Sequence, residues 1–317
     1  MPPDAAAQFA PDGRLRHLIT LSGISRSLLR ELFAEADGYA AGGGRPLAGR
    51  LFVNIFFESS TRTRAAFEAA AKQLGADVVN LDQMTMSGET KRESLEDTVR
   101  TVAAMGASGI GLRHSESGAA ARAARAADES GVAVVNGGTG CESHPTQGLT
   151  DGYTLREIFG EDLSAPAVAI VGDVLHSRVA RSNMQILRTM GAADIRLIGP
   201  PPLCPPSLRD ELGAPVFSDM DEGLRNADVV MLLRVQRERL RGEFCAAPDA
   251  YLSAYGMTDA RLARLKSSAV VMHPGPINRG MEIADAAADG EQSRILRQVA
   301  NGMAIRKAVL ARLCAAR

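Results

Sequence analysis

The segment FFESSTRTR, residues 56–64, places hydroxyl and guanidinium side chains directly after an apolar run, LFVNIFF. At a strand-to-helix turn, the first backbone N–H groups of the helix would add donors where the helix dipole favours an anion. We therefore predict a phosphate cradle at Ser60, Thr61, Arg62 and Thr63. The segment is not a Walker A loop, because the G-x-x-x-x-G-K-[ST] spacing is absent. Taken alone, it equally fits a helix N-cap followed by solvent-facing arginines.

Polar residues also follow other apolar runs of the first half. Arg113 lies in GIGLRH, and His144 and Gln147 flank Pro-Thr in HPTQ, after VAVVNGG. An imidazole can donate to a carbonyl oxygen, and an amide can hold a neighbouring NH2 group. A lone histidine is more often structural, but this one shares the expected strand edge with two arginines.

The second half repeats this pattern with further cationic residues. Arg178 follows the run AIVGD, and Arg234 and Gln236 end the run MLLRVQ. The run VVMHPGP closes on a rigid turn, Pro274 to Pro276. Two cationic clusters facing each other across a cleft would neutralise ligands that carry phosphate on one side and carboxylates on the other.

Short apolar runs alternate with helical patterns along the whole chain, which predicts an α/β protein. The fold class we expect is two doubly wound parallel-sheet domains. We also expect an active-site cleft between them, because ligands bind beyond the carboxyl ends of parallel strands. We place the first domain at residues 1–147, completed by a C-terminal helix over 293–317, and the second at 148–292. The predicted strands cover 50–57, 77–81, 109–114, 132–138, 166–173, 194–200, 214–217, 228–235 and 269–275. The predicted helices cover 61–75, 94–106, 118–130, 147–160, 177–191, 205–213, 257–267 and 293–314.

Composition narrows the function classes. The chain has 317 residues and a formal net charge of -1, so no global field favours nucleic acid or a membrane surface. No apolar run approaches the ~18 residues of a membrane helix, and the first residues lack the apolar core of a signal peptide. The cysteines lie far apart without C-x-x-C spacing, which favours a reducing cytoplasm and argues against disulfides and zinc. They are Cys141, Cys204, Cys245 and Cys314.

The combined motifs resemble the aspartate carbamoyltransferases of the aspartate/ornithine transcarbamoylase superfamily. They are FFESSTRTR, SGETKRESLEDT, LRH, HPTQGLTD, GDVLHSRVARSN, RVQRER and MHPGPINRGMEI, in family order from about Arg14 to the C-terminus. STRTR and HPTQ mark the superfamily, whereas HPGP and RVQRER are similar to the aspartate enzymes. Ornithine enzymes would be expected to have cysteine in an H-C-L-P segment, where this chain has Pro274.

The resemblance implies transfer of the carbamoyl group of carbamoyl phosphate to L-aspartate in pyrimidine biosynthesis, with no metal or organic cofactor. It assigns catalysis to His144, Arg62, Thr63, Arg113 and Lys91. It assigns the binding of carbamoyl phosphate to Ser60, Thr61, Arg62, Thr63, Ser87, Arg113, His144, Gln147, Pro274, Gly275 and Pro276. It assigns the binding of aspartate to Lys91, Arg178, Arg234 and Gln236.

Ser87 and Lys91 lie in a polar loop that by itself predicts only a solvated surface segment. The resemblance implies that this loop reaches the active site of a neighbouring subunit in a homotrimer. The chain departs from the family at Arg92, where glycine is usual, and a non-glycine residue resists positive φ there. The GTGCES segment before HPTQ also departs from the usual loop.

Two alternatives to this function stay open. One is a transcarbamoylase for another amino acid such as ornithine, and the other is a non-catalytic anion-binding paralogue that acts as an assembly scaffold. The resemblance also leaves open a partner, either a regulatory chain that responds to nucleotides or a dihydroorotase-like protein.

Overall fold

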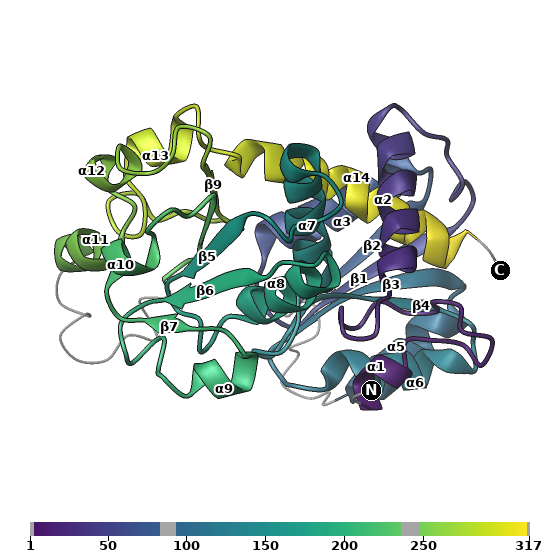
Figure 1. The fold of residues 1–317 in the computed structure, drawn as a ribbon. Helices are drawn as coiled ribbons and strands as arrows, with labels where there is room; N and C mark the ends of the chain where they lie inside the picture. Colours follow the sequence, from purple (N-terminus) through teal and green to yellow (C-terminus); the bar gives the residue numbers. More distant parts are fainter. Residues whose placement is uncertain (1–2, 83–92, 236–247, 316–317) are drawn as a thin grey trace. The chain divides into compact units, whose positions relative to one another are not determined.

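The computed structural model describes residues 3–82, 93–235 and 248–315. The chain divides into two compact units (Figure 1): unit 1 is Met1–Tyr153 with Ala300–Arg317, and unit 2 is Thr154–Val299. Five residues singled out in the sequence lie outside the described residues: Ser87, Lys91, Arg92, Gln236 and Cys245.

Unit 1 contains a four-stranded sheet in the order β2-β1-β3-β4, and every pairing is parallel. Its strands are β1 (Leu51–Phe56), β2 (Asp77–Asp82), β3 (Ala107–His114) and β4 (Ala133–Thr139). The apolar runs form buried strands because both faces of the sheet are covered by helices. The register pairs Phe56 of β1 with Arg113 of β3, so their carboxyl ends lie side by side.

Helices cover both faces of this sheet (Figure 1). On one face, side chains of α5 and α6 pack on Val53, Ile55 and Val134. On the other, Phe67 of α3 stacks on Phe52, with ring centroids 6.1 Å apart. The helices of this unit are α1 (Pro3–Ala6), α2 (Arg26–Ala40), α3 (Thr61–Gln73), α5 (Leu95–Ala104) and α6 (Ala119–Asp128), with parts of α7 (Pro145–Phe159) and α14 (Ile295–Cys314).

Unit 2 contains a five-stranded parallel sheet in the order β7-β6-β5-β8-β9. Its strands are β5 (Ala167–Val171), β6 (Asp194–Ile198), β7 (Val216–Phe217), β8 (Val229–Leu232) and β9 (Val270–Met272). The helices that lie wholly within this unit are α8 (Arg178–Thr189), α9 (Leu208–Leu212), α10 (Met220–Gly223), α11 (Pro248–Tyr255), α12 (Asp259–Leu262) and α13 (Asp285–Asp289). The predicted pair of parallel-sheet α/β domains is therefore confirmed.

The helical predictions were incomplete, and α10, α11 and α13 were not predicted. No element was predicted before residue 50, yet α2 spans Arg26–Ala40 and begins at Ser25, whose side chain accepts from Leu28 N. The helix predicted over 257–267 is only α12, four residues long.

Candidate active site

The predicted phosphate cradle lies where β1 leads into α3. Ser60 is the N-cap residue of α3, but within the described part of the chain its side chain makes no capping hydrogen bond. In contrast, the side chains of Ser25, Ser94 and Ser177 all cap their helices. The geometry thus disfavours the view of Ser60 as a simple side-chain cap, and the first turn of α3 retains its preference for an anion.

Arg113 is held rigidly at the end of β3. Its Nη1 donates to the carbonyl oxygen of Gly137 at 3.1 Å, and its Nε lies 3.2 Å from a carboxylate oxygen of Glu58. The Arg113 side chain is 13% exposed. These contacts restrict a guanidinium that could otherwise adopt many rotamers, which reduces the entropy lost when it binds an anion.

Gly137 brings β4 close to the first turn of α3. A Cβ atom built at this glycine would lie 3.0 Å from a ring carbon of Phe67 and 3.4 Å from Cγ2 of Thr63. The same glycine accepts from Arg113. Its lack of a side chain therefore lets the strand that leads toward HPTQ pack beside two predicted phosphate ligands, Thr63 and Arg113.

The loop between β4 and α7 is organised by a buried amide. Asn136 Nδ2 donates to the carbonyl oxygen of Ile19 at 2.8 Å and to Thr139 Oγ1 at 3.0 Å. Its Oδ1 accepts from Gly138 N at 2.8 Å. These bonds fix the path of the chain just before His144.

His144 and Gln147 lie at the start of α7, and both side chains are buried. Thr146 Oγ1 lies 3.4 Å from Nδ1 of the His144 ring. Gln147 Nε2 donates to Asp151 Oδ1 at 2.7 Å. The strand order therefore places the cradle after β1, Arg113 in β3 and the His144 segment after β4 along one edge of the sheet.

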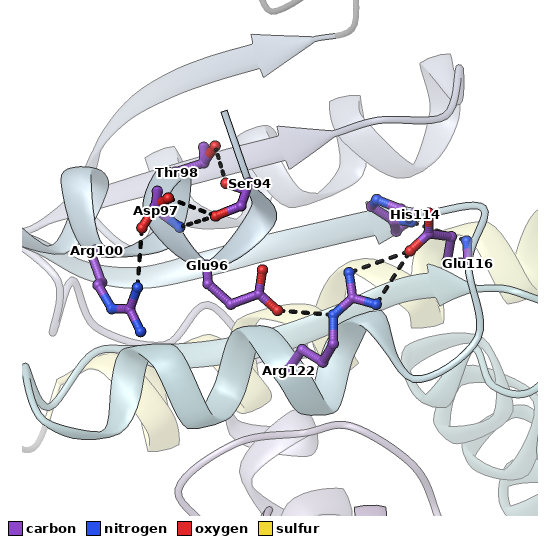
Figure 2. A network of polar contacts seen from close by, with 8 residues as sticks. All are labelled: Ser94, Glu96, Asp97, Thr98, Arg100, His114, Glu116 and Arg122. Atoms are coloured by element: carbon purple, nitrogen blue, oxygen red, sulfur yellow. Dashed lines mark hydrogen bonds and ion pairs between the residues drawn. The ribbon is translucent and has the colours of Figure 1, made fainter. Parts of the chain in front are cut away.

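A polar network joins the end of β3 to α5 and α6 (Figure 2). Arg122 of α6 donates through Nε to Glu96 at 2.9 Å and through both terminal nitrogens to Glu116 at 3.2 and 3.3 Å. His114 accepts from the backbone N of Glu116 at 3.0 Å. Burial lowers the pKa of His114 from 6.5, and the carboxylate of Glu116 acts in the opposite direction. The network anchors the residues that directly follow Arg113.

We predict that His114 makes the folded protein less stable in mild acid. Because its folded-state pKa is lowered, the unfolded chain binds more protons between that lowered value and 6.5. The free energy of unfolding therefore falls as pH drops through this window. The variant His114→Gln should lose less stability than the wild type between about pH 7 and about pH 5, measured by urea unfolding. Parallel pH profiles for the two proteins would contradict this expectation.

Unit 2 brings another group of predicted residues to one edge of its own sheet. Arg178 is the first residue of α8, directly after the capping residue Ser177. Arg234 is exposed and follows β8, and Pro274–Gly275–Pro276 follows β9. Because β5, β8 and β9 are consecutive neighbours, the segments that follow them begin at adjacent carboxyl ends.

The turn after β9 is fixed by buried side chains. Gly275 N donates to His273 Nδ1 at 2.8 Å. His273 Nε2 lies 3.3 Å from Glu282, and the other oxygen of that carboxylate accepts from Asn278 Nδ2 at 3.1 Å. The backbone carbonyls of this turn are thereby held by contacts inside unit 2.

Sequence reasoning overlooked two residues that lie behind the predicted ligands: Asp151, which accepts from Gln147, and Arg306. Gln147 and Asp151 form an i, i+4 pair, a spacing that places two side chains on one helical face. Glu58, for which the resemblance implies arginine partners, has a carboxylate oxygen 3.2 Å from Arg113 Nε. Arg306 lies 155 positions after Asp151, and no local pattern links them.

Residues 3–82, 93–235 and 248–315 contain no cluster of three or more His, Cys, Asp or Glu side chains suited to a metal ion. None of the described helices is long and apolar enough to cross a membrane. Cys141, Cys204 and Cys314 are free thiols, and burial raises the pKa of Cys204 to about 12.

Two family models match most of the chain. The model described as aspartate/ornithine carbamoyltransferase, carbamoyl-P binding domain, matches residues 16–157. The model described as aspartate/ornithine carbamoyltransferase, Asp/Orn binding domain, matches residues 166–313.

Individual relatives match over nearly the full length. The aspartate carbamoyltransferase catalytic subunit of Xanthomonas campestris pv. campestris (strain B100) is 50% identical over 96% of this chain and 97% of its own. The structure of ornithine carbamoyltransferase from Thermus thermophilus has a TM-score of 0.82 at 28% identity, covering 95% of this chain and 99% of that one. Aspartate transcarbamoylase from Trypanosoma cruzi, in complex with carbamoyl aspartate and phosphate, has a TM-score of 0.80 at 26% identity, covering 99% and 98%.

Proposed function

The chain belongs to the aspartate/ornithine carbamoyltransferase family, and we propose that it transfers the carbamoyl group of carbamoyl phosphate to the amine of L-aspartate. The products are N-carbamoyl-L-aspartate and phosphate, in de novo pyrimidine biosynthesis. The observation that carries the choice of aspartate is the 50% identity with an aspartate carbamoyltransferase catalytic subunit over 96% of the chain.

The edge of the unit 1 sheet binds carbamoyl phosphate in this proposal. The first turn of α3, with Ser60, Thr61, Arg62 and Thr63, holds the phosphate together with Arg113. His144 donates to the carbonyl oxygen, and Gln147 holds the carbamoyl NH2. Two observations support this assignment: the Ser60 side chain makes no capping hydrogen bond among the described residues, and Arg113 is restrained by Gly137 and Glu58.

Catalysis follows from charge that develops on the carbamoyl oxygen. The deprotonated amine of aspartate attacks the carbamoyl carbon, and negative charge grows on that oxygen in the tetrahedral transition state. Donors from His144, Thr63 and Arg113 stabilise it, and their fixed positions avoid reorganisation during the reaction.

Phosphate leaves with the electron pair of the broken C–O bond and can accept the proton that the amine releases. This route uses no protein nucleophile. The arginines Arg178 and Arg234, with Gln236, bind the two carboxylates of aspartate, since guanidinium groups pair with carboxylates in bidentate geometry. The assignment of Pro274, Gly275 and Pro276 to the carbamoyl NH2 stays a prediction from the resemblance.

Three further features of the proposal come from the resemblance. The protein acts as a cytoplasmic homotrimer whose active sites are shared between subunits. Ser87 and Lys91 reach the active site of the neighbouring subunit, where Lys91 contacts both substrates. A regulatory chain or a dihydroorotase-like partner would be revealed by the mass of the purified complex.

A panel of amines tests the proposed reaction. Incubation with carbamoyl phosphate and L-aspartate should give a ureido product, identified by mass spectrometry, while L-ornithine should give far less. Ornithine is the alternative substrate to include, because ornithine carbamoyltransferases are among the similar structures. A product from ornithine alone would replace the proposal, and tight phosphate binding without any product would favour the scaffold alternative.

A further inference from the structure

A buried chain of contacts lies behind Gln147 in unit 1. Gln147 Nε2 donates to Asp151 Oδ1 at 2.7 Å, and Asp151 is 1% exposed. Arg306 of α14 is also buried, and its Nη1 donates to the carbonyl oxygen of Gly302 at 2.9 Å. Its guanidinium carbon lies 5.7 Å from the ring centroid of Phe67 in α3. Arg306 therefore packs against the helix that begins with the phosphate cradle.

Arg306 and Asp151 attract each other across this interior. Burial lowers the pKa of Arg306 to about 10, and the charge of Asp151 opposes that shift. The guanidinium thus stays protonated at neutral pH.

Two buried charges are a costly way to stabilise a core. Among the described residues, the buried Nε of Arg306 has no hydrogen-bond partner. Buried ion pairs often contribute no more stability than apolar side chains of similar volume, because both charges lose their hydration. Packing alone therefore does not account for the two buried charges.

We propose that Asp151, supported by Arg306, is a positioning residue that holds the Gln147 amide with its oxygen toward the carbamoyl NH2. This inference rests on the proposed function. An ionised carboxylate can only accept hydrogen bonds, so the amide nitrogen of Gln147 must face Asp151. The amide oxygen then faces away, and it is the one atom of that amide able to accept from NH2.

This orientation makes the site selective for carbamoyl over acyl phosphates. The NH2 of carbamoyl phosphate donates to Gln147 Oε1, whereas the methyl group of acetyl phosphate leaves that oxygen unpaired. A buried acceptor without a partner loses its hydration and gains nothing in exchange. Sites that hydrogen-bond a substrate NH reject the analogue without it for this reason.

Asp151→Asn tests the proposal with a side chain of the same shape. An asparagine can donate or accept, so Gln147 can turn its NH2 group toward the substrate. We expect the preference for carbamoyl phosphate over acetyl phosphate to fall about tenfold, measured as the ratio of their dissociation constants by calorimetry. With turnover, KM for carbamoyl phosphate should rise more than kcat falls.

Asp37→Asn is the matched control for the substitution itself. Asp37 Oδ1 accepts from Tyr153 Oη at 2.7 Å, so it too is a carboxylate bonded to a side chain of α7. This variant should keep the wild-type preference even where its stability changes.

A double variant separates positioning from general damage. Once Gln147→Ala has removed the amide, adding Asp151→Asn should lower the preference no further. The proposal is overturned if folded Asp151→Asn keeps the wild-type preference, or if it lowers the preference equally without Gln147. Calorimetry needs no turnover, so this result is independent of whether the wild type carbamoylates aspartate.

Arg306→Gln provides the same readout where Asp151→Asn does not fold. It removes the supporting charge and should lower the preference in the same direction, by a smaller factor, whereas an unchanged preference would reject the support assigned to Arg306. Arg312→Gln is its control in the same helix, because Arg312 forms ion pairs with Glu31 and Glu35 instead. That control should keep the wild-type preference.

Discussion

Replacing His144 with alanine is expected to lower kcat by about a hundredfold or more, with little change in the affinity for inorganic phosphate. The imidazole is assigned to the carbonyl oxygen, which gains charge only as the amine attacks. Its hydrogen bond therefore strengthens in the transition state and contributes little to ground-state binding. Steady-state kinetics with saturating aspartate give kcat, and calorimetry gives the dissociation constant of phosphate.

His17→Ala is the matched control for this prediction. His17 is fully buried in the same unit, where Nε2 lies 3.1 Å from Asp128 Oδ1 and Nδ1 accepts from Val134 N at 3.0 Å. Its loss should lower the free energy of unfolding but leave turnover per folded molecule unchanged. Unchanged turnover in His144→Ala would instead make His144 a structural residue like His17.

The parallel sheets could be predicted because their signal is local. A strand buried on both faces is a continuous apolar run, as in LFVNIF and AVAIV, and each is followed by a helical pattern. Helix α2 was missed although its sequence carries a local helical signal. Its buried residues Leu29, Leu32, Phe33 and Ala36 have the i, i+3, i+4, i+7 spacing of an amphipathic helix, and charged or polar residues occupy most other positions.

The site residues could be predicted from the sequence only where they lie at the ends of predicted strands. Residues that follow neighbouring parallel strands share an edge, which placed Arg113 and His144 without any knowledge of their contacts. The contacts themselves depend on packing between distant segments. Glu58 lies 3.2 Å from Arg113, and Arg306 attracts Asp151 from a helix at the other end of the chain. Periodicity in one segment carries no information about such pairs.

The proposed role of Lys91 depends on a neighbouring subunit. Lys91 lies outside the described residues, and Arg92 beside it replaces the glycine that is usual in the family. The variants Lys91→Ala and Arg62→Ala should each be nearly inactive alone. One lacks the cation assigned to both substrates, and the other lacks a cation of the phosphate cradle.

Mixing these two inactive variants should restore activity after dissociation and reassembly. In a hybrid trimer, a Lys91→Ala chain supplies an intact cradle and an Arg62→Ala neighbour supplies an intact loop. Random association from equal amounts makes about one quarter of the sites whole. A mixture of Arg62→Ala with His144→Ala is the control, because both residues belong to unit 1 of one chain, and every site then keeps a lesion. Mass spectrometry verifies subunit exchange. If exchange is complete and activity stays at parental levels in both mixtures, Lys91 does not act across a subunit boundary, and its loop is a solvated surface segment.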